Sequence, residues 1–237
     1  MKEELKEKHP EIYNYIEWIS EQEDIDCCLD DFDITELADG IIKISSSKWE
    51  KSKCYVKKND FIEAESGSRK DDGQQNEFLN YLLPNKTYVI DGYTKYITDS
   101  LRRVVLVISD RNKETMIEHG DPYDKTCNRV REEGKEGDEA GHLISRATGG
   151  ANEKINLVPM SKMINKEDKN GIWWNLEQLE LAALKLGKNV ISIRQLLYKE
   201  NSKRPYTIIS TTIIDGYPLL FYKVPNPSID TDNESYS

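Results

Sequence analysis

Apolar residues at the start of the chain recur at helical spacing, whereas later ones form the short runs typical of strands. Residues 2–22 predict an amphipathic helix with Glu and Lys on its polar face. Pro10 interrupts this helix, and we expect a restart there because proline suits a first helical turn. Apolar runs at 40–44 and 53–56 then predict two short strands. The apolar face of the helix holds Leu5, Ile12, Ile16 and either Ile19 or Trp18.

A polar, glycine-containing stretch at 66–75 separates this start from a strand-rich middle, and its composition predicts a linker. Strand-type runs at 87–90 and 93–96 flank an Asp-Gly pair at 91–92, which is a strong hairpin signal. The apolar run at 104–108 predicts a buried strand. The middle of the chain therefore predicts a sheet built largely from neighbouring strands.

The last half of the chain begins with a charged segment, 109–137, which we expect to be loop-rich. Further along, one apolar face at 172–186 predicts a helix, with Gly187 as its C-terminal cap. The tail from Pro225 is rich in Asp, Ser and Asn and is expected to be disordered. Further strands are expected at 142–145, 157–159, 190–193, 207–214 and 219–222, the last two joined by an Asp-Gly hairpin.

Composition narrows the class of protein. The chain has 237 residues, of which 37% are hydrophobic and 32% charged, and its formal charge is −10. No apolar run approaches the roughly 20 residues that span a bilayer, so no membrane segment is expected. The charged N-terminus is not a signal peptide. We therefore expect a protein that is cytoplasmic in its producer and that, if secreted, leaves by a system independent of a signal peptide.

Charge and cysteine content add two further expectations. The negative charge argues against a broad basic surface for nucleic acid, although a bound divalent cation could supply positive charge locally. The four cysteines show no metal-ligand spacing, and without a secretory signal we expect reduced thiols. They are Cys27, Cys28, Cys54 and Cys127.

Residues 138–177 carry the candidate chemistry. His142 follows two acids and a glycine, and asparagines and a glutamate come after it at compact spacing. An imidazole titrates near neutrality and can accept a proton from water. Amide and carboxylate oxygens suit Mg²⁺, which keeps several waters, whereas a zinc site would need more His or Cys ligands. The pattern indicates magnesium-dependent phosphoryl chemistry, with Mn²⁺ as the alternative ion.

The order of these residues, from Asp138-Glu139-Ala140-Gly141-His142 through Asn-Leu-Val-Pro at 156–159 to Glu177, resembles the DNA/RNA non-specific endonucleases. These enzymes have a ββα-metal (His-Me finger) active site, and the likeness is to the branch at the C-termini of bacterial polymorphic toxins. It extends from about Leu83 to Lys223.

The resemblance implies roles for individual residues. His142 would be the base, Asn165 the metal ligand and Glu177 the acid that holds metal-bound waters. Glu139 stands where the family normally has aspartate, and Asp138 is the alternative acid. For other positions the roles are open. Asn170 competes with Asn165, and Asn156 is expected to tie the finger together, with metal contact as its alternative. The upstream phosphate-binding arginine would be Arg129 or else Arg131, and Arg146 and Lys162 are further candidates for contact with nucleic acid.

The fold that the resemblance implies is α+β, with a mixed or antiparallel sheet and a ββα-metal finger. A small α+β module of unknown role (1–78) would precede a nuclease domain (79–225) and a disordered tail (226–237). The implied activity is metal-dependent cleavage of DNA, with RNA as a further substrate, by a bacterial toxin effector that has a cognate immunity protein. A catalytically degenerate binding or regulatory protein on the same fold is the alternative.

Overall fold

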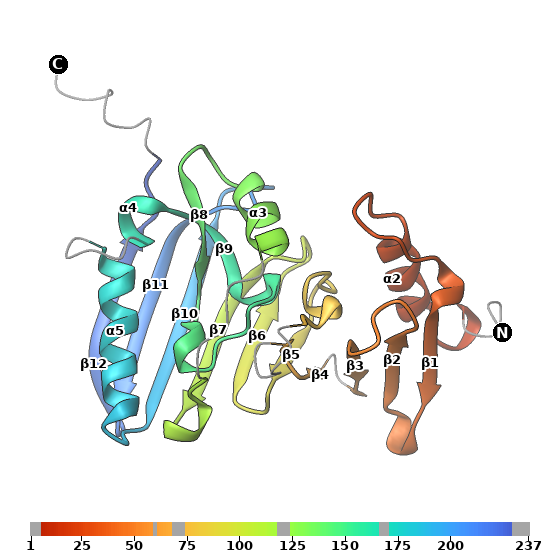
Figure 1. The fold of residues 1–237 in the computed structure, drawn as a ribbon, viewed down its shortest axis with the longest axis horizontal. Helices are drawn as coiled ribbons and strands as arrows, with labels where there is room; N and C mark the ends of the chain where they lie inside the picture. Colours follow the sequence, from red (N-terminus) through yellow and green to blue (C-terminus); the bar gives the residue numbers. More distant parts are fainter. Residues whose placement is uncertain (1–5, 59–60, 68–73, 118–123, 166–170, 229–237) are drawn as a thin grey trace.

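The computed structural model describes residues 6–58, 61–67, 74–117, 124–165 and 171–228. Within these ranges ten strands form a single sheet (Figure 1). The strands are β1 (Phe32–Glu36), β2 (Ile42–Ser46), β3 (Lys53–Val56), β4 (Phe61–Ala64), β5 (Thr87–Ile90), β6 (Thr94–Thr98), β7 (Val104–Arg111), β10 (Val190–Tyr198), β11 (Pro205–Ile214) and β12 (Tyr217–Pro225), in that order across the sheet. Neighbouring strands are antiparallel except β4 and β5, which are parallel.

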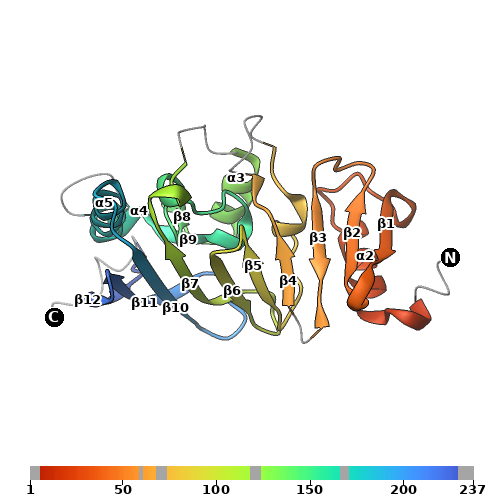
Figure 2. The same ribbon diagram turned by 90° about the horizontal axis from the view of Figure 1, so that it is seen from below.

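Helices and a two-stranded hairpin cover the sheet. The helices are α2 (Pro10–Ser20), α3 (Asp124–Glu132), α4 (Lys162–Asn165) and α5 (Ile172–Lys185), and the hairpin joins β8 (Asp138–His142) to β9 (Leu157–Ser161). Figure 2 shows α3, α5 and the hairpin on the same face of the sheet. The hairpin followed by α4 forms the strand–strand–helix finger, so the α+β prediction is confirmed. None of the described helices is both long and apolar enough to span a membrane.

Local signals located several elements correctly. Pro10 is the first residue of α2. The Asp-Gly pairs at 91–92 and 215–216 have positive φ at both residues, as a tight hairpin between twisted strands requires. Gly187, with φ of 75°, follows the end of α5. All four cysteines are free thiols.

The charged segment at 109–137 was wrongly predicted to be mostly loop. Strand β7 continues to Arg111, and α3 occupies 124–132. The apolar pattern of α3 is weak because few of its side chains are buried; Cys127 and Val130 pack against Leu157 of the hairpin. The first strand of the finger also lies earlier than expected, at 138–142 instead of 142–145, because its polar sequence has no hydrophobic alternation.

The predicted linker and tail are also more ordered than expected where the structure describes them. Ser66, Gly67 and Gln75 are buried, whereas 68–73 lie outside the described residues. The side chain of Asn226 is buried and donates to the carbonyls of Pro159 and Pro205. Residues 229–237 lie outside the described part. Buried polar contacts, which composition does not reveal, anchor both segments.

The sheet and core are continuous across residue 78. Strand β4 pairs with β5, and Ile44 and Ile62 share one hydrophobic core with Tyr88 and Tyr96. Residues 1–78 and 79–225 therefore pack as one body. That the two parts differ in role stays a prediction.

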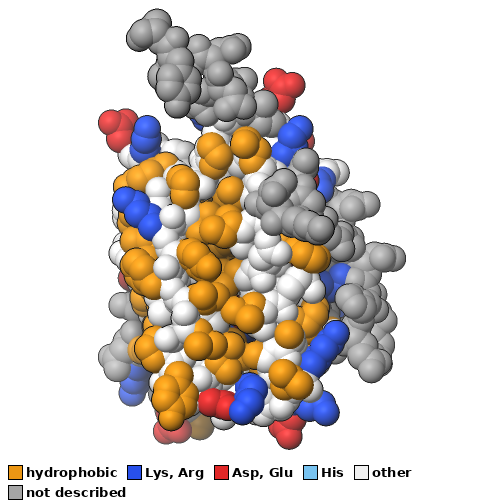
Figure 3. Space-filling model, turned by 90° about the vertical axis from the view of Figure 1, so that its left-hand side faces the viewer, with side chains coloured by type: hydrophobic (Ala, Val, Ile, Leu, Met, Phe, Trp, Pro, Cys, Tyr) orange, Lys and Arg blue, Asp and Glu red, His pale blue; other side chains and the backbone are white. Residues whose placement is uncertain are grey.

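The sheet ends at β12, whose outer edge carries exposed large side chains. Tyr217, Leu219 and Phe221 are each more than half exposed. Figure 3 views this side of the molecule and shows hydrophobic side chains gathered on it. Pro218 and Pro225 lie near the two ends of the strand, and proline limits pairing of an open edge with another strand.

Candidate active site

His142 is the last residue of β8, and its position is held from two sides. Its main chain pairs with Leu157 of β9, and the indole Nε1 of Trp173, in the first turn of α5, donates to its carbonyl at 2.8 Å. Its ring Nε2 lies 3.2 Å from Oδ1 of Asn152. Because an amide oxygen only accepts, this contact selects the tautomer protonated at Nε2 and leaves the Nδ1 lone pair to accept a proton.

The environment of His142 keeps its ring neutral. Burial lowers the pKa of the imidazole below its usual 6.5, and the hydrogen bond with Asn152 partly opposes this effect. The guanidinium of Arg146 lowers the pKa further. Arg146 lies four residues later in the short helix η7 (Arg146–Thr148). A neutral imidazole at neutral pH is the form that can act as a base.

Asn156 closes the loop that carries these groups. Its Oδ1 accepts from the amide of Ile144 at 2.9 Å, and its Nδ2 donates to the carbonyls of Ile144 and Ala151, both at 2.8 Å. The side chain is fully buried. Gly150 is also required here, because a Cβ would collide with the carbonyl of Ile144. These contacts favour the expected structural role of Asn156 over metal ligation.

Asn165 and Glu139 are brought together by the finger. The Asn165 Nδ2, at the end of α4, donates to Oε2 of Glu139 on β8 at 2.8 Å. A carboxylate can bond only the NH₂ side of the amide, so it orients the amide oxygen away from itself. Asp138, the alternative acid, is instead buried in an ion pair with Arg204, with Nη2 to Oδ1 at 2.9 Å. Asn170 lies outside the described residues.

Glu177 lies one turn after Trp173 on α5. Burial and the negative charge of Glu180 raise its pKa to about 8, although Arg194 and Arg111 oppose the shift. A carboxyl group so disfavoured as an anion gains most from a nearby cation. No group of three or more His, Cys, Asp or Glu side chains that could hold a metal occurs in the described ranges. The oxygen donors of Asn165, Glu139 and Glu177 are of the kind that a hydrated hard cation takes.

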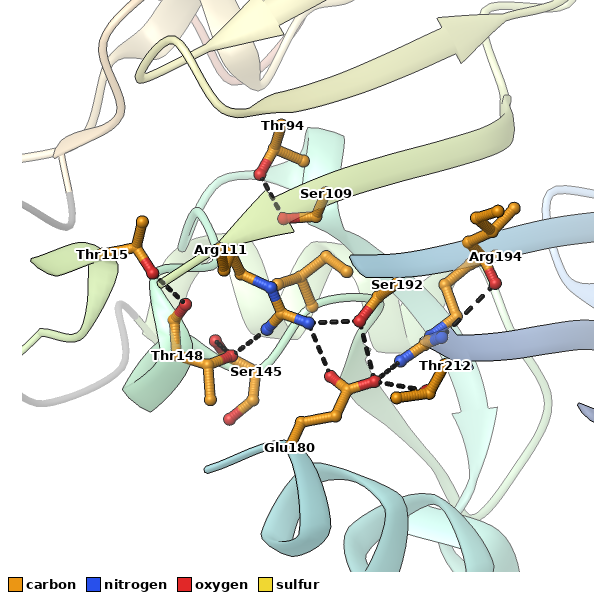
Figure 4. Close-up of polar contacts among 12 residues, drawn as sticks. Thr94, Ser109, Arg111, Thr115, Ser145, Thr148, Glu180, Ser192, Arg194 and Thr212 are labelled. Carbon is orange, nitrogen blue, oxygen red and sulfur yellow. Dashed lines mark hydrogen bonds and ion pairs between the residues drawn. The ribbon is translucent and has the colours of Figure 1, made fainter. Parts of the chain in front are cut away.

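A buried ion cluster lies beneath α5 and was not predicted from the sequence (Figure 4). Glu180 accepts from Nη2 of Arg111 at 2.7 Å and also pairs with Arg194. Arg111, on β7, further donates to Thr148 of η7 and to Ser192 of β10. The cluster thus joins the sheet, α5 and the loop after His142. Its only sequence signal was an arginine within each of two apolar strands.

The other predicted basic residues lie in different surroundings. Arg129, on α3, donates to Asp24 and to the hydroxyl of Tyr81, and none of its described contacts is with His142. Arg131 is exposed and bonds Asn128. Lys162 is exposed at the start of α4. Of the basic candidates, only Arg146 has an electrostatic effect on His142 among the described contacts.

The sequence matches a family of known proteins. The profile of the DNA/RNA non-specific endonucleases matches residues 84–216. The type VII secretion system protein EssD of Staphylococcus aureus (strain USA300) is 32% identical over 176 residues, which is 71% of this chain but 26% of EssD. The proteins of the same name from strains NCTC 8325 / PS 47 and Newman match equally. The chain thus spans about a quarter of the length of the relatives it matches.

Two solved nuclease structures are similar at low identity. NucA from Streptococcus agalactiae with magnesium ion bound is 13% identical, with a TM-score of 0.44, over 93% of this chain and 92% of NucA. The Sda1 nuclease with bound zinc ion is 12% identical, with a TM-score of 0.46, over 57% of this chain and 74% of Sda1. Because the family profile covers more than half of the sequence, this chain belongs to the DNA/RNA non-specific endonuclease family.

Proposed function

We propose that this protein hydrolyses phosphodiester bonds in DNA and RNA with little sequence preference, and that His142 is its general base. The observation that carries the proposal is the orientation of the ring. Asn152 accepts from Nε2, and Trp173 fixes the main chain of the same residue. In this tautomer Nδ1 carries the free lone pair, and it would take a proton from the attacking water.

We assign the cation-binding role to the finger beside it. The amide oxygen of Asn165, oriented by Glu139, would be the direct ligand, and Glu177 would hold waters of the ion. When bound there, Mg²⁺ or Mn²⁺ would neutralise charge on the phosphate and the departing oxygen. Arg146 supplies a second positive charge near His142.

The test compares three proteins in a plasmid and RNA digestion assay with Mg²⁺: wild type, His142→Ala and His9→Ala. The matched control is His9, a histidine near Glu36 at 4.0 Å and remote in sequence from the finger. We expect His142→Ala to lose about 10²–10⁴-fold in rate and His9→Ala to keep it. Equal rates for all three would refute the assignment of the base. A wild type that binds nucleic acid but never cuts with Mg²⁺ or Mn²⁺ would support the catalytically degenerate alternative.

We further propose that the chain is the nuclease part of a secreted bacterial toxin. The support is its similarity to a protein named for type VII secretion, together with a nuclease family assignment. A toxin that cuts nucleic acid without sequence preference endangers its producer, so a cognate immunity protein is expected as a partner. Expression of active protein without that partner should kill the host, whereas expression of His142→Ala should not.

A further inference from the structure

A cleft of roughly 370 Å³ lies beside the finger. One wall comes from Trp18, Gln22 and Asp24, which precede the region matched by the family profile. The other wall includes 157–159 of β9. Leu157 is the residue that pairs with His142 across the hairpin, so the cleft borders the strand next to the candidate base.

The cleft is basic although the chain is acidic. Five cationic and three acidic side chains line it, whereas the whole chain has a formal charge of −10. The cations are Arg102, Arg103, Arg129, Lys154 and Lys203, and the acids are Asp24, Glu132 and Glu133. Asp99, which is not among the lining residues, pairs with Arg103 at 2.7 Å, so the excess of positive charge is small and lies mainly at Arg102, where it favours an anionic ligand.

Three of these arginines stack on aromatic rings. The guanidinium carbon lies 3.7 Å from the ring centre of Trp18 for Arg102, 4.6 Å from that of Tyr198 for Arg103 and 4.7 Å from that of Tyr81 for Arg129. Stacking holds each guanidinium in a fixed plane, and a planar guanidinium is suited to bind phosphate oxygens. Cations interleaved with aromatic rings are typical of grooves that bind single-stranded nucleic acid.

Arg102 has no acidic partner among the residues that the structure describes. Its guanidinium donates from Nη1 to the carbonyl of Leu82 at 3.0 Å. Burial lowers the pKa of its guanidinium. Its backbone has φ of 62°, a conformation unusual for a residue with a side chain. An uncompensated, partly buried cation held at the rim of a cleft would gain from an anionic ligand.

Arg129 already holds an anion, supplied by the N-terminal segment. Oδ2 of Asp24 accepts from Nη1 of Arg129 at 2.7 Å and from the hydroxyl of Tyr81 at 2.9 Å. Burial raises the pKa of Asp24, but these hydrogen bonds and the Arg129 charge outweigh it and keep the carboxylate ionised. Because Asp24 is 36% exposed, the pair is partly in water and can exchange at small cost. Lys154 and Lys203, by contrast, both pair with Glu133.

We propose that this cleft binds the backbone of single-stranded nucleic acid next to the bond that is cut, and that a backbone phosphate displaces Asp24 from Arg129. The inference rests on the proposed function and gives the N-terminal segment a role as one wall of the substrate groove. Arg102 can bind phosphate directly, because it has no acidic partner among the described residues. Arg129 binds phosphate only after Asp24 has left it.

The test is direct binding of a short labelled oligothymidylate, measured by fluorescence anisotropy in EDTA at low salt with the full chain. We expect Arg102→Gln and Arg129→Gln each to weaken binding about five- to tenfold, because each removes a phosphate contact. Lys188→Gln is the matched control. It also removes a cation paired with an aspartate, Asp215 at 2.8 Å, but on another part of the surface.

Asp24→Asn is expected to strengthen binding about three- to tenfold, because the amide no longer competes with phosphate. Asp26→Asn removes the same charge from the same segment, where Asp26 is fully exposed and 3.9 Å from Lys48, and should leave binding nearly unchanged. Equal effects of these two variants would overturn the proposal, as would unchanged binding in both arginine variants. Thermal melting confirms that each variant is folded.

Two further arms identify the ligand. Inorganic phosphate at the same phosphate concentration should compete poorly; effective competition would make this a site for free anions and overturn the proposal. A blunt duplex that binds as tightly as the single strand would also overturn it. Because no metal is present, these results do not depend on cleavage. Failure of the proposed function would instead appear as unchanged digestion by His142→Ala.

Discussion

At the residue scale, the proposed chemistry depends on side chains that orient other side chains. Asn152 sets the tautomer of His142, and Glu139 sets the direction of the Asn165 amide. Neither orienting residue touches the proposed reacting atoms. Their substitution should therefore change pH dependence or metal dependence before it changes the fold.

Glu139→Ala should raise the Mg²⁺ concentration needed for half-maximal cleavage by about 10–100-fold, because Asn165 loses the acceptor that orients it. Glu136→Ala is the control, since Glu136 is exposed just before the same strand. A titration of rate against Mg²⁺ measures both. A reduced maximal rate at unchanged Mg²⁺ dependence would contradict the orienting role of Glu139.

Asn152→Asp should move the acid limb of the pH–rate profile upward by about one unit, because a carboxylate beside the ring stabilises the imidazolium. Wild type should retain activity below pH 6.5, since burial and Arg146 lower the pKa of His142. Asn112→Asp, at an exposed cap, is the control. A profile that does not move in Asn152→Asp would argue against His142 as the titrating base.

At the scale of elements, α5 carries two glutamates in adjacent turns whose pKa values are shifted in opposite directions. Burial disfavours both anions, but two arginines overcome this effect at Glu180 and lower its pKa to about 2. At Glu177 burial prevails and raises the pKa to about 8. The carboxylate of Glu180 anchors the helix to the sheet. Burial makes the ionised form of the Glu177 carboxyl unfavourable, and such a shifted pKa is common at functional positions.

Glu180→Gln should lower the free energy of unfolding by about 2–5 kcal/mol, because it leaves Arg111 and Arg194 buried without their counter-charge. Glu177→Gln, one turn away, should instead raise it by about 1–3 kcal/mol at pH 8.5. Urea unfolding of the two variants tests the pair, and each serves as the control for the other. A loss of stability in both would contradict this assignment.

The gain from Glu177→Gln should depend on pH. Between the unfolded pKa of about 4.5 and the folded pKa of about 8, the native protein binds more protons than the unfolded chain at this site. Wild type therefore loses stability as pH rises through this window, and the glutamine variant does not. The difference should be small near pH 5 and largest above pH 8. A constant difference across that range would mean that Glu177 does not titrate as stated.

At the scale of the whole molecule, the N-terminal part and the family-matched part are one folded unit. They share a sheet and a core, and the buried carboxylate of Glu153 accepts from the amides of Gly67 and Asn76, at 2.6 and 2.9 Å. Asp24 and Arg129 add a contact at the cleft. Both the strand pairing and the polar contacts therefore cross the predicted boundary near residue 78.

The full chain should therefore unfold in one cooperative thermal transition followed by calorimetry, because a shared core couples the two parts. A fragment of residues 79–225 should be less stable, since it lacks β1 to β4 and therefore leaves the edge of β5 unpaired. Two separate transitions in the full chain, or a fragment as stable as the whole, would show that 79–225 is an independent domain.

The sequence by itself determined the elements that depend on neighbours along the chain. Local conformational preference predicts both Asp-Gly hairpins, the helix start at Pro10 and the cap at Gly187. Motif spacing predicts the finger. The short polar strand β8 was placed too late and the weakly amphipathic α3 was not predicted, because their burial comes from packing against each other. The family and the candidate base could therefore be inferred from residue order alone.

Only the tertiary structure decided which side chains meet. Arg111 reaches Glu180 across 69 positions of sequence, and Asp24 reaches Arg129 across 105. No periodicity records such a pairing, because it depends on which strands and helices pack together after the chain has folded. The sequence therefore indicated the proposed proton acceptor and the proposed metal ligand, whereas the buried ion cluster and the basic cleft exist only through long-range packing.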